Sequence, residues 1–231
     1  MKYEAFDTLA LEEIFKFDSV VHLRLSSREN GQLEFKESFN IQSAPDYART
    51  MAAFANASGG YLVFGVKDKP RDLMGLTNNA FDNLDPAKLT EHLNSALAPE
   101  LHWEQTIHTV KGKKVGIIYV HEARNKPVVC TKNSGDRKEG DIYYRYRGRS
   151  EKIKYPELRQ ILEGEREQER QLWMTMLQKM ARMGIENVGI LNSTTGQISG
   201  ASGSLLISEE LLPKLKFITS GRLSSRKGHP S

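Results

Sequence analysis

The chain has 231 residues, of which 39% are hydrophobic and 27% are charged, and its formal net charge at pH 7 is +4. This composition predicts a soluble globular protein with room for one large domain or two small ones. It excludes a membrane-spanning protein, because no apolar run approaches the roughly 18–20 residues that a membrane helix needs. The single cysteine excludes a disulfide framework, and the N-terminus lacks the pattern of a secretory signal, so we expect a cytoplasmic protein.

The first half of the chain alternates helix-forming and strand-forming segments. We expect a helix at residues 8–17, strands at 20–25 and 33–36, a helix at 46–57 and a strand at 61–66. The residues from Leu33 to Lys36 alternate apolar and polar, as in a strand that buries one face. Residues 61–66 are nearly all apolar, which is typical of a strand buried on both faces in the middle of a sheet.

The second half adds another helix and several antiparallel pairs. We expect a helix from 85 to 97, strands at 101–110 and 114–120, strands at 127–131 and 142–147, and a helix at 155–163. A glycine turn, Lys111-Gly112-Lys113, joins the first two of these strands as a hairpin. This mixed order predicts the α+β class, with a mixed, largely antiparallel sheet and flanking helices.

The last part of the chain has a different pattern. Residues 164–184 place apolar side chains at helical spacing, which predicts an amphipathic helix that either packs on the preceding domain or contacts a second copy. Its apolar stripe consists of Trp173, Met176, Leu177, Met180 and Met183. Residues 185–231 are rich in glycine and serine and end in a basic tail, so we expect partial disorder there. The expected divisions are 1–26, packing on the core, a domain at 27–163, the helix at 164–184 and the tail at 185–231.

Four charged residues lie where two predicted strands begin and end. Glu34 and Lys36 share one face of their strand, and Glu29 lies just before the turn that leads into it. Asp68 follows the central strand, at the rim of the sheet. Carboxylates that meet at such a rim bind a hard cation such as Mg²⁺ or Mn²⁺, and a nearby lysine stabilises charge on a phosphate. These residues predict the catalytic and metal site of a metal-dependent phosphodiesterase. The alternative is a set of exposed acids paired with neighbouring lysines.

Positive charge is concentrated between residues 111 and 154, where thirteen basic side chains occur with five acidic ones. Arg145 and Arg147 share one face of a strand that also carries tyrosines, a pattern suited to phosphate contact and base stacking. The alternative is an ordinary half-buried strand with a solvated polar face. The candidate nucleic-acid-binding residues are Arg145, Arg147, Arg149, Lys152, Lys111, Lys113 and Lys114.

Three motifs together resemble the Schlafen-type AlbA-like domain. Residues 29–38 read E-N-G-Q-L-E-F-K-E-S, residues 54–68 read F-A-N-A-S-G-G-Y-L-V-F-G-V-K-D, and residues 144–150 read Y-R-Y-R-G-R-S. The similarity covers about residues 27–163. This chain has Gly-Arg-Ser at 148–150, where the family often has Gly-Ser-Ser.

The resemblance implies a Schlafen AlbA-like fold, nucleic-acid binding and a metal-dependent endoribonuclease that cuts transfer RNA, in a defence or stress response. The family's three carboxylates match Glu29, Glu34 and Asp68. Many members are described only as DNA-binding or ATP-binding regulators, so a non-catalytic DNA- or RNA-binding module is the alternative. ATP is not expected, because the chain has no G-x-x-x-x-G-K-[ST] string. One compact copy offers a small groove, so we expect a homodimer.

Overall fold

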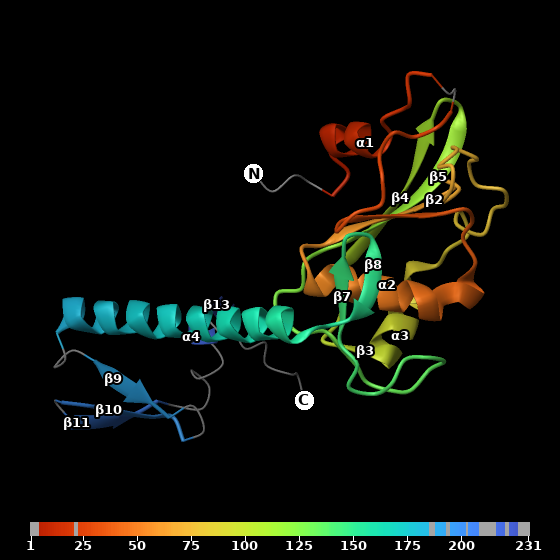
Figure 1. Ribbon diagram of the computed structural model, residues 1–231. Helices are drawn as coiled ribbons and strands as arrows, with labels where there is room; N and C mark the ends of the chain where they lie inside the picture. The colour runs from red at the N-terminus through yellow and green to blue at the C-terminus, as the bar shows by residue number, and fades with distance from the viewer. Residues whose placement is uncertain are drawn as a thin grey trace. The chain divides into compact units, whose positions relative to one another are not determined.

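Figure 1 shows the protein as a computed structural model. The structure describes residues 5–20, 23–184, 188–192, 195–201, 203–207, 216–219 and 222–225. The chain divides into two compact units, Met1–Ile161 and Leu162–Ser231, which are described in turn. None of the helices in the described part combines the length and the apolar character that crossing a membrane requires.

A four-stranded mixed sheet organises the first unit, with the strand order β1-β2-β5-β4 (Figure 1). Its strands are β1 (Leu33–Lys36), β2 (Gly60–Phe64), β4 (Trp103–Val110) and β5 (Lys113–Val120). β1 and β2 pair in parallel, whereas β2 with β5 and β5 with β4 pair antiparallel. The predicted α+β class and the largely antiparallel sheet are therefore confirmed.

The parallel pair requires a crossover, and a helix provides it. The helices of this unit are α1 (Thr8–Ile14), α2 (Ala44–Asn56) and α3 (Pro86–Ala96), with the short 3-10 turn η1 (Ile41–Ser43) before α2. Pro45 lies in the first turn of α2, where a missing N–H has no intrahelical partner to lose. Most residues of α2 are buried, because this helix covers one face of the sheet.

The sheet is buried on both faces, which explains why β2 is almost entirely apolar. Leu62 and Phe64 pack in one core with α2 and α3, and Val63 packs in a second core with α1. Phe35 of β1 belongs to the α1 core. Because side chains alternate along a strand, Glu34 lies on the opposite face, which α2 covers.

The segment before β1 does not form the predicted strand at 20–25. Among the described residues, Arg24 and Leu25 make isolated bridges rather than a ladder. Leu23 has a φ of 64°, in the left-handed region, and this conformation interrupts an extended strand. Residues 21–22 lie outside the described residues.

A second hairpin packs against α2 and completes the first unit. It consists of β7 (Tyr143–Tyr146) and β8 (Arg149–Lys152), and a short pair is formed by β3 (Leu97–Ala98) and β6 (Val129–Cys130). The predicted strand at 142–147 therefore ends one residue early, because Arg147 has a φ of 45° and begins the hairpin turn.

Helix α4 (Tyr155–Met183) runs without a break where the sequence predicts two helices that meet near residue 164. A glycine such as Gly164 costs a helix only about 1 kcal/mol relative to alanine. That cost does not end a helix whose flanking residues are mostly glutamate, glutamine and arginine. The helix therefore begins in the first unit and continues in the second.

In the described parts of the second unit, five short strands follow α4. They are β9 (Gly189–Leu191), β10 (Gln197–Gly200) and β11 (Gly203–Leu206) in one antiparallel sheet, and β12 (Lys216–Thr219) and β13 (Arg222–Ser225) in a hairpin. The rest of the tail for which the sequence predicts partial disorder, including 208–215 and 226–231, lies outside the described residues.

Candidate functional site

Strand β1 presents Glu34 and Lys36 on the face that α2 covers, as the alternation predicts. The Nζ atom of Lys36 lies 2.6 Å from Oε1 of Glu34. The Glu34 side chain is only 10% exposed, whereas that of Lys36 is 38% exposed. One carboxylate oxygen of Glu34 is thus neutralised by a lysine that still reaches solvent.

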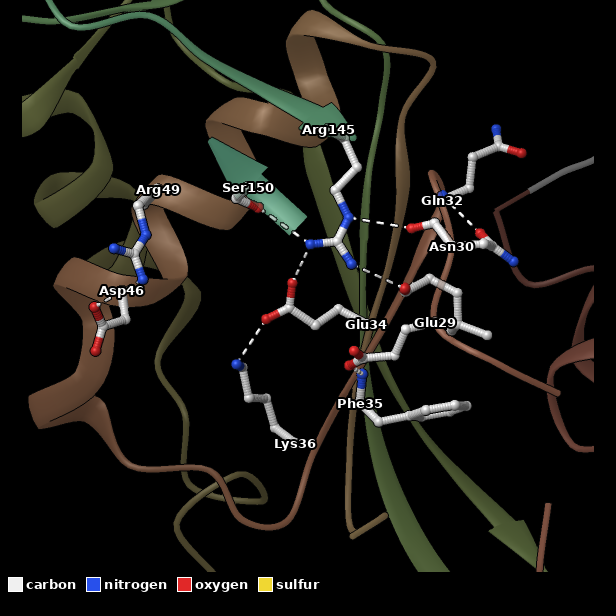
Figure 2. A network of polar contacts seen from close by, with 11 residues as sticks. Glu29, Asn30, Gln32, Glu34, Phe35, Lys36, Asp46, Arg49, Arg145 and Ser150 are labelled. Carbon is white, nitrogen blue, oxygen red and sulfur yellow. Dashed lines mark hydrogen bonds and ion pairs between the residues drawn. The ribbon is translucent and has the colours of Figure 1, made fainter. Parts of the chain in front are cut away.

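Arg145 lies inside the domain rather than on its surface (Figure 2). Its side chain is 1% exposed, and its Nη1 atom lies 2.5 Å from Oε2 of Glu34. The guanidinium also lies 4.9 Å from the centre of the Phe54 ring. The prediction that Arg145 contacts a phosphate is therefore wrong. The alternation of a strand does not distinguish an arginine that faces solvent from a buried one. It also does not show that Arg145 pairs with a buried carboxylate 111 residues away in the chain.

The Arg145 guanidinium also joins segments that are distant in the sequence. Its Nε and Nη2 atoms donate hydrogen bonds to the carbonyl oxygens of Asn30 and Leu33, at 3.2 and 3.1 Å. Nη1 donates a further hydrogen bond to Oγ of Ser150, at 3.2 Å (Figure 2). The turn before β1 and both strands of the β7–β8 hairpin are thereby fastened together. Ser150, the serine that this chain shares with the family motif Gly-Ser-Ser, is the one that bonds Arg145. Arg149, which replaces the other serine of that motif, is exposed.

Glu29 and Asp68 complete the predicted set of carboxylates. Glu29 is half-buried, and its Oε1 accepts a hydrogen bond of 2.8 Å from the backbone N–H of Phe35. Asp68 is exposed in the turn that follows β2. Burial raises the pKa of Glu29, the charges of Glu34 and Asp68 raise it further, and the Phe35 N–H and Arg145 oppose the rise. Glu34 and Asp68 therefore each lie near enough to Glu29 for their charges to act on it.

We expect Glu29→Gln to raise the melting temperature at neutral pH. The amide oxygen keeps the hydrogen bond from Phe35, while the buried charge and its repulsion are removed. Because the folded-state pKa lies above the ordinary value of 4.5, ionisation of Glu29 destabilises the fold at neutral pH. This destabilisation disappears as the pH falls through the folded-state pKa toward 4.5.

Melting curves of the wild type and Glu29→Gln, recorded from neutral pH to below 4.5, measure this effect. The advantage of the variant should shrink to zero at the acid end. A variant that melts below the wild type at neutral pH contradicts the expectation.

The β7–β8 turn, which lies between Arg147 and Arg149, packs on Glu29. Arg147 and Gly148 have φ values of 45° and 101°, as in the two-residue turns that suit a twisted hairpin. A Cβ atom added to Gly148 would lie 3.4 Å from the backbone and Cβ of Glu29, so the turn packs directly on that residue. Arg147 and Arg149 are both exposed. Two of the predicted phosphate-binding side chains therefore extend from a turn that rests on the acidic group.

The asparagine of the middle motif, Asn56, fixes the end of α2 on which the hairpin packs. Its side chain is fully buried, and its amide nitrogen donates hydrogen bonds of 2.9 Å to the carbonyl oxygens of Val128 and Tyr143. Its Oδ1 accepts a hydrogen bond of 2.7 Å from the Val128 N–H. Asn56 therefore ties α2 to β7, the strand that carries Arg145.

The other predicted basic residues lie away from the β7–β8 turn. The lysines of the β4–β5 hairpin have neighbours within the domain: the pairs are Lys111 with the Phe17 ring, Lys113 with the Met74 carbonyl oxygen, and Lys114 with the Asp82 carboxylate. The strand register places this hairpin turn at the end of the sheet where β1 and β2 finish. Lys152 lies 2.8 Å from Asp141, and its hydrogen bond holds the pKa of Asp141 below the ordinary range.

Oxygen ligands for a hard divalent cation are available at Glu29 and Asp68. Part of the rise in the Glu29 pKa comes from neighbouring negative charge, which a bound cation would relieve. Glu34 differs, because Arg145 and Lys36 already pair with its two oxygens. Among the described residues, Glu29, Glu34 and Asp68 do not bring one donor atom each within 4.8 Å of one another, so the predicted ligands are not assembled as a group. Glu29 and Asp68 still offer the oxygen ligands that Mg²⁺ or Mn²⁺ prefers, with Glu34 as a neighbouring charge.

Another possible ligand group was missed by sequence reasoning. Across the part of the chain that the structure describes, one group of three imidazole or carboxylate side chains has its donor atoms within 4.8 Å of one another: His102, Glu104 and His121. These residues do not have the spacing of a known metal motif. The register of the β4–β5 hairpin brings them together. Pairing the two strands of the predicted hairpin residue by residue would have indicated this group.

Comparison with known proteins adds three findings. The family model described as "Schlafen, AlbA_2" matches residues 29–154. A relative from Ureaplasma parvum serovar 3, named an uncharacterized ATP-binding protein, is 40% identical over an alignment of 226 positions that covers 89% of this chain and 64% of that relative. This chain thus spans less than two thirds of the relative's length.

Two solved structures match part of the chain. The DIP2311 protein from Corynebacterium diphtheriae is 24% identical, with a TM-score of 0.37 over 55% of this chain and 20% of that one. The N-terminal domain of a protein from Nitrosomonas europaea, described as related to the ATP-dependent DNA helicase RecG, is 26% identical, with a TM-score of 0.35 over 56% of this chain and 89% of that one.

Proposed function

Because the chain belongs to the Schlafen AlbA_2 family, we propose that it binds nucleic acid and cleaves RNA in a reaction that requires Mg²⁺ or Mn²⁺. Family membership supports a nucleic-acid-related function. Transfer RNA, the substrate that the resemblance implies, is the first RNA to test, and the cleavage would serve a defence or stress response.

The observation that carries this proposal is the contact between the β7–β8 turn and Glu29. The turn between the exposed Arg147 and Arg149 packs on Glu29, and the charges of Glu34 and Asp68 raise the pKa of Glu29, which supports a phosphate-binding surface beside a metal-binding one. An RNA backbone held by the arginines would bring a phosphodiester close to the carboxylates. A surface that served only to attract phosphates gains nothing from carboxylates beside it, because they repel the same phosphates.

Each residue of the site has a distinct role in the proposed cleavage. Arg147 and Arg149 hold the RNA phosphates, and Glu29 and Asp68 hold the cation. When bound, a divalent cation neutralises phosphate charge and acidifies a water ligand. Lys36, which is partly exposed, stabilises negative charge on the phosphate. Arg145 is a positioning residue that holds Glu34 and the hairpin and does not touch RNA.

The experiment that tests the proposal is a cleavage assay on purified full chain. Transfer RNA, another structured RNA, single-stranded DNA and double-stranded DNA are each incubated with Mn²⁺ or with EDTA. We expect cleavage of RNA in Mn²⁺ and none in EDTA. Binding without cleavage of any substrate overturns the catalytic part of the proposal.

The second candidate function is a DNA- or RNA-binding module without catalysis. The observation that favours it is the neutralisation of Glu34 by Arg145 and Lys36, which gives this carboxylate a structural role. This candidate predicts that binding persists in EDTA and does not need Glu29 or Asp68, whereas Glu34 is needed only for the fold.

We expect the double variant Arg147→Ala/Arg149→Ala to weaken nucleic-acid binding and to lower its salt dependence. Each lost phosphate contact removes about 0.7–0.9 from the slope of log affinity against log salt. Fluorescence anisotropy with labelled RNA, measured at several salt concentrations in EDTA, gives both quantities. The matched control is Lys88→Ala/Lys132→Ala, which removes the same charge at exposed positions outside the hairpin. Equal slopes for the two double variants would show that the arginines make no special contact.

ATP and a second copy of the chain complete the list of proposed partners. The chain has no P-loop string, but the name of the Ureaplasma relative weighs against excluding ATP, so nucleotide binding belongs in the same assays. Support for a homodimer comes from the apolar stripe of α4, where Trp173, Met176, Leu177 and Met183 are between 46% and 65% exposed.

A further inference from the structure

Two histidines and a glutamate meet on one face of the β4–β5 hairpin, away from the acidic group. Glu104 lies in β4, two residues after His102, so both side chains point to the same face. Trp103 pairs with Val120, so the register places His102 opposite His121. A hydrogen bond of 2.9 Å from the His121 N–H to the His102 carbonyl oxygen continues the ladder past the end of the strands.

The donor atoms of these three side chains converge. The Nε2 atom of His121 lies 2.6 Å from Oε1 of Glu104, and the imidazole rings of His102 and His121 have their centres 4.2 Å apart. One donor atom from each residue lies within 4.8 Å of the others. The ring of Tyr119 contacts His121 edge-on, with the ring centres 4.8 Å apart. Glu104 lies within β4, and His102 and His121 directly adjoin the ends of the paired strands, where a backbone hydrogen bond joins them to each other.

We propose that His102, Glu104 and His121 form a binding site for a transition-metal ion of the Zn²⁺ type. Two imidazole nitrogens and one carboxylate oxygen are ligands that zinc prefers, at about 2.0–2.2 Å. The ion would take the place of the proton that lies between His121 and Glu104. Three protein ligands would leave a tetrahedral ion one open position for water or another ligand. His102 and Glu104 also line a surface cavity of about 440 Å³.

The chemistry of this site differs from that of the acidic group on β1. Imidazole nitrogens favour Zn²⁺, Cu²⁺ and Ni²⁺, whereas Mg²⁺ favours oxygen ligands and dehydrates reluctantly. The chain would therefore bind two kinds of cation at two places. Zinc bound at the hairpin bridges the two antiparallel strands at their open end and stabilises their pairing.

Calorimetric titration of the metal-free full chain with Zn²⁺, in the presence of excess Mg²⁺, tests the proposal. We expect one zinc site that Mg²⁺ does not displace. His102→Ala and His121→Ala should each weaken it by more than about tenfold, and Glu104→Gln by less. The visible spectrum of the Co²⁺-loaded wild type provides a second readout, because imidazole ligands in tetrahedral geometry give intense absorption bands.

The matched controls are His108→Ala and Asp68→Asn. His108 lies on the same strand but stacks on Phe15, with ring centres 5.7 Å apart, and is not part of the group. Both controls should bind zinc as the wild type does, and melting curves of the metal-free variants show that each is folded. Failure of the wild type to bind zinc, unchanged affinity in both histidine variants, or loss of binding in Asp68→Asn would each overturn the proposal.

Discussion

Glu34→Ala is expected to lower the free energy of unfolding by about 3–5 kcal/mol. The substitution leaves the guanidinium of Arg145 without its counter-charge at a position where the side chain is 1% exposed. The bonds from Arg145 to Asn30, Leu33 and Ser150 use neutral oxygen atoms, which cannot replace a carboxylate. Urea denaturation followed by circular dichroism measures the loss as a lower midpoint.

Two further variants separate the buried pair from the exposed one. Lys36→Ala, which removes the half-exposed partner of Glu34, should cost about 1 kcal/mol or less. The double variant Glu34→Leu/Arg145→Met replaces both buried charges with apolar groups and should recover most of the stability that Glu34→Ala loses. A Glu34→Ala protein with the wild-type midpoint contradicts the structural role of the pair. Glu34→Ala is for the same reason a poor probe of catalysis, because loss of activity would follow from loss of the fold.

Asp68→Asn is expected to slow metal-dependent RNA cleavage by about a hundredfold or more while leaving the fold intact. Asp68 is exposed in the turn after β2, and such surface substitutions usually change stability by about 0.5 kcal/mol or less. A metal ligand is worth several kcal/mol in the transition state, and each 1.4 kcal/mol is about a tenfold change in rate. The measurement is the single-turnover rate on transfer RNA in Mn²⁺, with anisotropy in EDTA as the readout of binding.

The matched control for Asp68→Asn is Asp136→Asn, which makes the same change at an exposed loop position. It should cleave at the wild-type rate. Wild-type cleavage by Asp68→Asn would show that this carboxylate has no catalytic role, and the binding-only function would then be the better account. Weaker binding by Asp68→Asn in EDTA would contradict the division between arginines that bind and carboxylates that react.

The sequence predicted the fold well where each residue depends on its immediate neighbours. The alternation in β1 placed Glu34 opposite Phe35, the apolar run in β2 identified a central strand, and the glycine turn identified the β4–β5 hairpin. The errors have local causes too. The strand predicted at 20–25 fails because Leu23 adopts a left-handed conformation, which the pattern of hydrophobic residues does not predict. The two helices predicted on either side of Gly164 form one helix because the helix propensity of the neighbouring residues outweighs the cost of one glycine.

The site was predicted less completely, because its geometry depends on contacts between distant residues. The motif predicted Glu29, Glu34 and Asp68 as one group of ligands. The charges of Glu34 and Asp68 raise the pKa of Glu29, but among the described residues the three side chains do not bring one donor atom each within 4.8 Å of one another. No pattern in the sequence indicates that the Arg145 side chain points inward to Glu34, since a period of two is the same for a solvated face and for a buried one. The convergence of His102 and His121 likewise depends on strand register, which a spacing rule does not contain.

The three hydrogen bonds of Asn56 have a consequence for the order in which the domain is assembled. Its partners lie 72 and 87 residues later in the chain, so a ribosome releases α2 long before the groups that satisfy this amide. Contacts of such long range slow folding, because the intervening loop must close before they form. If α2 packed on the sheet in a nascent chain that ends after β2, the Asn56 amide would be buried without its hydrogen-bond partners. Assembly of this part into its final form must await the synthesis of β7.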